Sequence, residues 1–184
     1  MMNYAPLPSS GAEFSWSHGD GTPAGSARMR WENEGWTAEM RLERDDATVV
    51  LRLSAQWRVQ QMLLFRDLEE PDLWLATDGG GRWGEVNGAH RTDLDGCTDI
   101  DLANSPFTNS IVIHRLPLHV GHTAEVPVVT VDVETLALGR ATHRYTRTGE
   151  SSWTYTSLAA GTDTPATVDA NGIVVDEDGS FTRS

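Results

Sequence analysis

Apolar and polar residues alternate one by one along much of the chain. Residues 36–42 carry Trp, Ala, Met and Leu at every second position. The same alternation runs through residues 49–59, where the apolar positions are Val49, Leu51, Leu53, Ala55, Trp57 and Val59. Because successive side chains of a strand point to opposite faces, both stretches are predicted to be half-buried β-strands. Shorter strands are predicted at 73–77, 82–86, 141–147, 153–158 and 173–175.

Turn-forming residues separate these predicted strands. Asn-Gly pairs at 87–88 and 171–172 are typical of tight hairpins, and three glycines follow one another at 79–81. Residues 123–138 form a longer β-branched run. Within it, Pro127 has no backbone N–H and indicates an edge, a bulge or a strand start. The sequence therefore predicts a mainly β fold, either a many-stranded antiparallel barrel or a strongly curled sheet.

One segment departs from the alternation. Ser105 is a residue type that caps helices, and proline suits the first helical position, which Pro106 would occupy. Phe107 and Ile111 then share a helical face at i, i+4 spacing, and Pro117 ends the segment. A short helical segment is predicted near 106–115.

Length and composition indicate a single globular domain over residues 1–184, with 39% hydrophobic and 22% charged residues. Residues 1–11 are rich in Pro, Ser and Gly and are expected to be flexible, as is a loop at 17–26. The start of the chain has no basic, apolar leader, and no run approaches the roughly 18 apolar residues of a spanning helix. A cytoplasmic location and no stable membrane anchoring are expected.

The formal net charge is −13 and the isoelectric point is near 4.7. A strongly acidic chain is repelled by phosphate backbones, so nucleic acid is not expected as a partner. The sequence also has no cluster of basic residues that would dock on an anionic membrane surface. The oligomeric state stays open.

Residues 95–101 contain three carboxylates and the single cysteine, Cys97. If this segment is a strand, Asp99 and Asp101 point to the same face. One interpretation is a polar patch that accepts hydrogen bonds from ligand hydroxyls. The other is structural: Asp95 lies in a turn, and Asp101 is solvated or paired with Arg115.

Asn109 and Arg115 lie on the predicted helical segment that follows. A carboxamide both donates and accepts hydrogen bonds, and a guanidinium binds a carboxylate with two parallel bonds. We expect Arg115 to clamp Asp99 or Asp101 and so to hold the helix against the sheet, a role favoured over direct ligand contact. Both residues are nevertheless ligand-binding candidates.

Seven tryptophans are many for 184 residues. Flat aromatic faces stack on sugar rings and suit acyl chains, so some could line a ligand cavity. Trp74 and Trp83 flank the triple glycine and are the lining candidates, whereas Trp36 and Trp57 alternate cleanly with polar neighbours and are assigned to the core.

Chemical signatures of catalysis are missing from the sequence. There is no GxSxG, P-loop, HExxH or CxxC motif, so we predict no catalytic residue, metal site or cofactor. Cys97 lies among carboxylates, which raise a thiol pKa, and is expected to be a small buried residue. His119 and His122 flank Gly121 and are expected to be solvated loop residues.

Several of these residues together resemble the signature of a glycolipid-binding family of bacterial proteins, first catalogued as a domain of unknown function. The resemblance is carried by Asp95-Gly96-Cys97, Asp99, Asp101, Pro106-Phe107-Thr108-Asn109 and Arg115-Leu116, and it continues at 144–147, 153–155 and 168–172. It covers about residues 28–176. At His114 the family usually has arginine. The resemblance implies a curled or closed antiparallel sheet, similar to that of lipoprotein-localisation carriers, with a hydrophobic interior.

Three functions follow as hypotheses. The leading one is a non-catalytic module that holds a glycolipid or another amphiphile in a β-barrel cavity, with the polar head near Asp99, Asp101 and Asn109. The alternatives are an enzyme acting on a small carbohydrate or lipid conjugate through the carboxylate pair Asp99 and Asp101, or a packed, ligand-free interaction domain.

Overall fold

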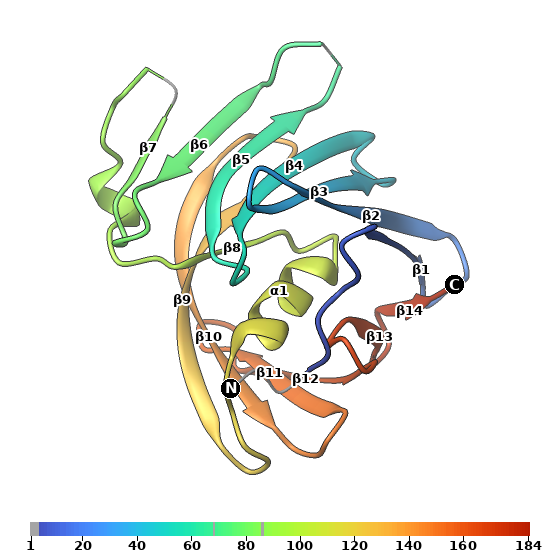
Figure 1. Ribbon diagram of the computed structural model, residues 1–184. Coiled ribbons are helices and arrows are strands. Elements are labelled where there is room, and N and C mark those ends of the chain that lie inside the picture. Colours follow the sequence, from blue (N-terminus) through green and yellow to red (C-terminus); the bar gives the residue numbers. More distant parts are fainter. Residues whose placement is uncertain (1–3, 68, 86) are drawn as a thin grey trace.

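A computed structural model describes residues 4–67, 69–85 and 87–184. In these ranges fourteen strands form one sheet that curls around a helix, α1 (Phe107–Arg115), as Figure 1 shows. A short 3-10 helix spans Thr92–Leu94. The strands are β1 (Ala12–His18), β2 (Pro23–Glu32), β3 (Gly35–Leu42), β4 (Ala47–Ser54), β5 (Val59–Phe65), β6 (Leu73–Thr77), β7 (Trp83–Glu85), β8 (Asp99–Asp101), β9 (Thr123–Val131), β10 (Leu138–Arg147), β11 (Ser152–Ser157), β12 (Thr162–Val168), β13 (Val174–Glu177) and β14 (Phe181–Arg183).

The sheet is a long meander whose two halves are joined through the chain termini. Its order is β7-β6-β5-β4-β3-β2-β1-β14-β13-β12-β11-β10-β9-β8. Neighbouring strands are antiparallel apart from β8, which pairs with β9 in parallel. Because β7 and β8 occupy the two ends of the order, the sheet is open. The prediction of a strongly curled, mainly antiparallel sheet with one short helix is confirmed, including the start of the helix after Pro106.

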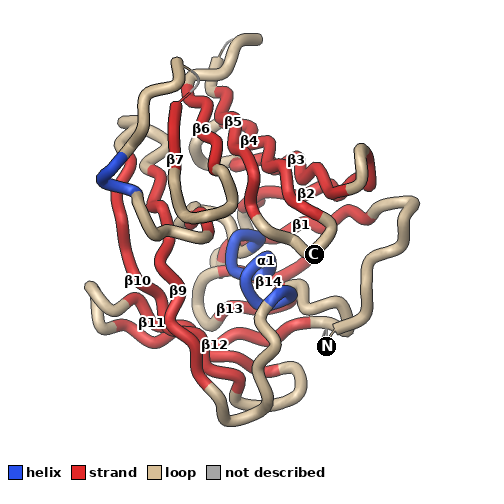
Figure 2. The backbone as a smooth tube through the Cα atoms, turned by 60° about the vertical axis from the view of Figure 1, so that its left-hand side comes forward, coloured by secondary structure: helices blue, strands red, loops and turns tan. Residues whose placement is uncertain are grey.

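The helix α1 lies inside the curl, with β9–β12 on one side and β1–β5 on the other (Figure 2). Its residues from Phe107 to His114 are all buried, because both of its faces meet the sheet. Phe107 and Ile111 join the larger core, under the amino-terminal strands. Val112 and Ile113 join a second core under β9–β13. A helix that is apolar on opposite faces is typical of a core position.

Two sequence predictions about strands were wrong. Residues 49–59 form two strands, because a turn intervenes in which Trp57 has a φ of 64° and Ser54 Oγ accepts hydrogen bonds from the backbone N–H of Gln56 and Arg58 at 3.2 Å. Because Trp57 is buried, the apolar alternation of the sequence continues through the turn although the strand does not. The loop expected at 17–26 is mostly strand, since β1 and β2 pair around a turn at 19–22.

The amino-terminal segment, from Tyr4 on, packs against the sheet. Tyr4 and Leu7 are both buried. The indole Nε1 of Trp153 donates a hydrogen bond of 2.6 Å to Tyr4 Oη, and the Arg147 guanidinium lies 5.0 Å from the centre of the Tyr4 ring. The first three residues lie outside the described ranges. None of the described helices has the length and apolar content to cross a membrane.

Candidate functional site

A buried asparagine links the helix to two strands. Ser105 Oγ accepts the backbone N–H of Phe107 at 3.2 Å, which sets the first turn of α1. One turn later, Asn109 Oδ1 accepts a hydrogen bond of 2.7 Å from Tyr145 Oη on β10. Asn109 Nδ2 donates one of 3.2 Å to Glu177 Oε1 on β13. This chain of side chains fixes the orientation of a carboxamide and a carboxyl group inside the curl.

Asp99 and Arg115 form a buried ion pair between β8 and the end of α1. Arg115 Nη1 and Nη2 donate to Asp99 Oδ1 and Oδ2, each at 2.6 Å, and Asp99 is 1% exposed. Burial lowers the pKa of Arg115, but the hydrogen bonds and charge of Asp99 outweigh it and raise that pKa above its ordinary value. The expected clamp is confirmed, with Asp99 as the partner.

Asp101, two residues along β8, faces a different environment. Its Oδ2 lies 4.0 Å from Nε2 of His143 on β10. Burial raises the pKa of the Asp101 carboxyl, and the nearby His143 and the Thr108 hydroxyl offset this only in part. Asp101 therefore keeps its proton to a higher pH than an ordinary aspartic acid.

Glu177 and Tyr155 form the other side of the same polar region. Glu177 is 5% exposed, and burial raises the pKa of its carboxyl. Burial and the negative charge of Glu177 raise the pKa of Tyr155 on β11. The Tyr155 hydroxyl is buried, and its polar neighbour among the described residues is the Glu177 carboxyl. Because the geometry of this contact is poor, the hydroxyl can turn to a ligand in the cavity without losing a good hydrogen bond.

These side chains line a cavity of about 350 Å³ beside the first half of α1. Along β11 and β12 the inward side chains change from apolar to polar toward the cavity: Trp153, Tyr155 and Ser157 on β11, and Ala166, Thr164 and Thr162 on β12. On β10 the wall is formed by His143 and Ala141, beyond the buried Tyr145. The cavity therefore lies where the second hydrophobic core ends.

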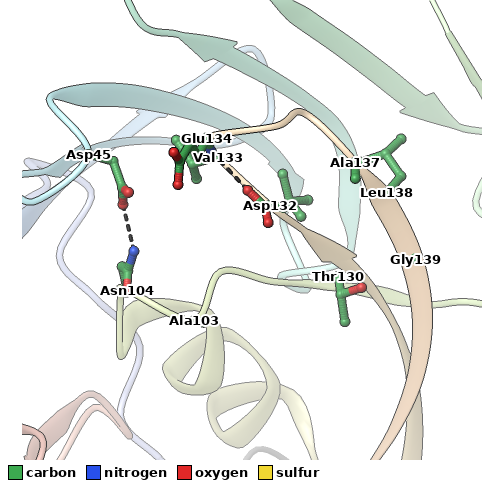
Figure 3. Close-up of a pocket in the computed structure, with 11 residues that line it drawn as sticks. Asp45, Ala103, Asn104, Thr130, Asp132, Val133, Glu134, Ala137, Leu138 and Gly139 are labelled. Carbon is green, nitrogen blue, oxygen red and sulfur yellow. Dashed lines mark hydrogen bonds between the residues drawn. The ribbon is translucent and has the colours of Figure 1, made fainter.

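A second hollow of about 500 Å³ adjoins this cavity and shares Ala103 and Thr130 with it. Figure 3 shows the segment that carries Ala103 and Asn104 lying between Thr130 of β9 and Asp45, in the turn between β3 and β4. Asn104 Nδ2 donates a hydrogen bond of 2.7 Å to Asp45 Oδ2 there. The opposite wall comes from the β9–β10 turn and includes Val133 and Leu138. The hollow adds the apolar side chains of Val133 and Leu138 next to the polar cavity.

Of the six ligand-binding candidates predicted from the sequence, two line this cavity and four do not. Asp101 and Asn109 line it. Asp99 and Arg115 are bonded to each other beneath it and do not appear in its wall. Their role in ligand binding stays a prediction.

Trp74 and Trp83 lie at the β6–β7 edge of the sheet. Trp74 is 38% exposed, whereas Trp83 is buried and donates its Nε1–H to the Cys97 carbonyl at 2.9 Å. Neither residue lines the cavity beside α1. Cys97 is buried, and burial raises the pKa of its thiol. Trp36 and Trp57 belong to the core, as expected.

Sequence reasoning missed His143, Tyr155 and Glu177. Each belongs to a strand, and each occupies an inward position where alternation alone would place an apolar residue. The available signal, which concerns Tyr155 alone, was the run of hydroxyl-bearing residues at alternate positions: Tyr155 and Ser157, then Thr162 and Thr164. Within the described residues, no group of three or more His, Cys, Asp or Glu is arranged to hold a metal ion.

The raised pKa of Glu177 predicts a pH dependence of stability. The folded protein holds this proton to a higher pH than the unfolded chain does, so the Glu177 contribution to stability is full below the ordinary carboxyl pKa and is lost as pH rises through the raised pKa. Glu177→Gln keeps an oxygen for the Asn109 bond and removes the titration. We expect its melting temperature to fall less than that of the wild type between about pH 5 and about pH 8. Glu39→Gln, at an exposed residue of β3, is the control; equal slopes for wild type and Glu177→Gln would contradict the assignment.

The fold and cavity define a class: a curled antiparallel sheet wrapped around one helix, with a polar cavity beside that helix. Residues 13–183 match the family described as "Putative glycolipid-binding", and the chain belongs to this family. This confirms the resemblance found in the sequence.

A solved structure supports the same fold. The crystal structure of a DUF1089 family protein from Pseudomonas aeruginosa superposes with a TM-score of 0.74 at 28% sequence identity, covering 98% of this chain and 95% of that one. No curated protein sequence matches the chain.

Proposed function

We propose that this protein binds an amphiphile with a sugar head group, without catalysing a reaction on it. The head group occupies the cavity formed by Asp101, Asn109, His143, Tyr155 and Glu177. The observation that carries the proposal is the cavity itself, about 350 Å³ and lined mainly by polar side chains, among them the buried Asn109 and Glu177 and the Tyr155 hydroxyl beside Glu177. The family description points to the same ligand class. A packed, ligand-free domain would leave space for only a few water molecules.

The apolar chain of the ligand takes a different route from the one expected from the sequence. The inside of the curl is filled by α1 and the two hydrophobic cores. The hollow that shares Ala103 and Thr130 with the cavity offers Val133 and Leu138 as apolar wall. We place the first part of the chain there. Each methylene that it buries contributes about 0.8 kcal/mol before the costs of ordering.

The test uses octyl β-D-glucoside below its micelle concentration, titrated into the protein and followed by isothermal calorimetry. Tyr155→Phe removes one hydroxyl from the cavity and keeps the ring. We expect it to weaken binding by about fivefold to tenfold, which corresponds to about 1 kcal/mol for one hydrogen bond. The matched control is Thr156→Val, which removes the neighbouring hydroxyl that bonds Asp163 on the outer face. Absence of binding, or equal affinity for wild type and Tyr155→Phe, would contradict the proposal.

A second candidate function is glycoside hydrolysis. Asp101 and Glu177 line one cavity, and a raised pKa suits the general acid of an acid/base pair, whose other member must be ionised at the same pH. Asp99 cannot join such a pair because Arg115 binds both of its oxygens. Nitrophenol release from a panel of nitrophenyl glycosides by the wild type, lost in Asp101→Asn, would favour an enzyme over a binding protein.

A further inference from the structure

The charged groups of the cavity wall determine which head groups it can accept. Two carboxyl groups, Asp101 and Glu177, face one imidazole, His143. His143 Nε2 lies 4.0 Å from Asp101 Oδ2, so the imidazole already faces a carboxyl group of the wall. Within the described residues no arginine contributes to the wall, and the chain contains no lysine at all. Arg44 lines a separate hollow that shares Ala103, Ser180 and Phe181 with the cavity. Among the described residues of the cavity wall itself, a negatively charged head group would meet no free cation.

The guanidinium groups on the elements that build the cavity are already bonded elsewhere. Arg115 of α1 uses two nitrogens on Asp99. Arg147 of β10 donates to the backbone carbonyls of Leu118, Gly149 and Glu150. Arginine is the residue that phosphate and carboxylate sites use most, because its planar fork matches two oxygens. The other three arginines of these elements are also bonded: Arg140 to the Asp95 carbonyl, Arg144 to Glu125 and Arg183 to Asp169. All five guanidiniums are therefore committed to contacts within the fold.

The remaining polar wall suits uncharged hydroxyl groups. Seven wall residues carry hydroxyls, which donate and accept hydrogen bonds equally well: Ser105, Thr130, Tyr155, Ser157, Thr162, Thr164 and Ser180. The two carboxyl groups are hydrogen-bond acceptors once ionised, and a sugar hydroxyl supplies the donor that a phosphate or sulfate lacks. Tyr155 and Phe181 add aromatic surface for the apolar face of a sugar ring.

We infer that the cavity selects an uncharged sugar and rejects phosphate and sulfate head groups. This inference rests on the proposed function and narrows its ligand class from amphiphiles in general to neutral glycosyl amphiphiles. The discrimination arises from the Asp101 and Glu177 carboxyl groups, which repel an anion once they are ionised, so it grows as the pH rises through their raised pKa values. The mechanism is local to the cavity and does not depend on the overall negative charge of the protein.

The experiment compares ligands that share one chain length: octyl β-D-glucoside, octyl phosphate and octyl sulfate, titrated into wild-type protein at about pH 9, so that carboxyl groups with raised pKa values are ionised. We expect the glucoside to bind at least about tenfold more tightly than either anion. In Glu177→Gln and in Asp101→Asn, octyl phosphate should gain affinity by about threefold or more, because one repulsive carboxylate is gone. Asp176→Asn changes the net charge equally on the adjacent residue outside the cavity wall, and its octyl phosphate affinity should stay as in wild type.

The possible results separate the two claims. Octyl phosphate binding as tightly as the glucoside, with both weakened by Tyr155→Phe, would overturn the selectivity and leave the proposed function intact. A gain in phosphate affinity in Asp176→Asn equal to that in Glu177→Gln would assign the effect to net charge and overturn the local mechanism. If none of the three ligands binds, the proposed function fails and the inference fails with it. The wild-type comparison decides the selectivity even if a cavity variant does not fold.

Discussion

Arg115→Met is expected to lower the free energy of unfolding by about 3–5 kcal/mol, because it leaves Asp99 charged and buried without its partner. Asp99 is 1% exposed, and Arg115 meets both of its oxygens at 2.6 Å. Urea unfolding followed by tryptophan fluorescence measures the loss. The matched control is Arg144→Met, which removes an arginine whose ion pair with Glu125 is solvent-exposed. Such surface pairs contribute about 0–1 kcal/mol.

A double variant identifies the cause of this loss. In Asp99→Asn/Arg115→Met the buried negative charge is absent, so part of the lost stability should return relative to Arg115→Met alone. The clamp also joins α1, which carries Asn109, to β8, which carries Asp101. We therefore expect weaker octyl glucoside binding in Arg115→Met wherever the variant remains folded. A loss no larger than that of Arg144→Met would show that the pair does not hold the helix.

The sequence predicted those features that depend on local pattern. The Ser105-Pro106 start of α1 follows from capping chemistry, and the Asp99–Arg115 clamp follows from the geometry of a guanidinium near a carboxylate. Alternation identified most strands because each has one buried face. Trp57 led to a wrong prediction. Its buried side chain continues the apolar alternation of β4, but its backbone is in a left-handed turn, so the strand ends before it.

The cavity could not be predicted from the sequence in the same way. His143, Tyr155 and Glu177 occupy inward positions of β10, β11 and β13, and only the curl of the sheet brings them to Asp101 and Asn109. Alternation in the sequence predicts that the two faces of a strand differ in polarity. It does not predict which polar residues on the inward face line a cavity. Trp74 and Trp83 illustrate the converse. They were proposed as cavity-lining residues because they flank the triple glycine, whereas the structure places them at the β6–β7 edge of the sheet.

Phe107→Ala is expected to destabilise the protein by about 3–5 kcal/mol, because it leaves a cavity at the point where helix and sheet meet. Phe107 is fully buried, and its ring centre lies 6.2 Å from that of Trp16 on β1 and 6.4 Å from that of Trp57. These contacts join α1 to the amino-terminal half of the sheet. The carboxy-terminal half meets the same helix through Val112 and Ile113. The helix is therefore the element through which the two halves share one core.

Chemical denaturation tests this prediction against Leu158→Ala, a control at a hydrophobic side chain that is 38% exposed and should change stability by less than about 0.5 kcal/mol. Phe107→Leu, which restores most of the volume, should lose less than Phe107→Ala. Ser105 and Asn109, both in the cavity wall, lie two residues to either side of Phe107. We therefore expect Phe107→Ala, where folded, to bind octyl glucoside more weakly than Leu158→Ala does. Equal stability of Phe107→Ala and Leu158→Ala would mean that α1 is not the link between the two halves of the sheet.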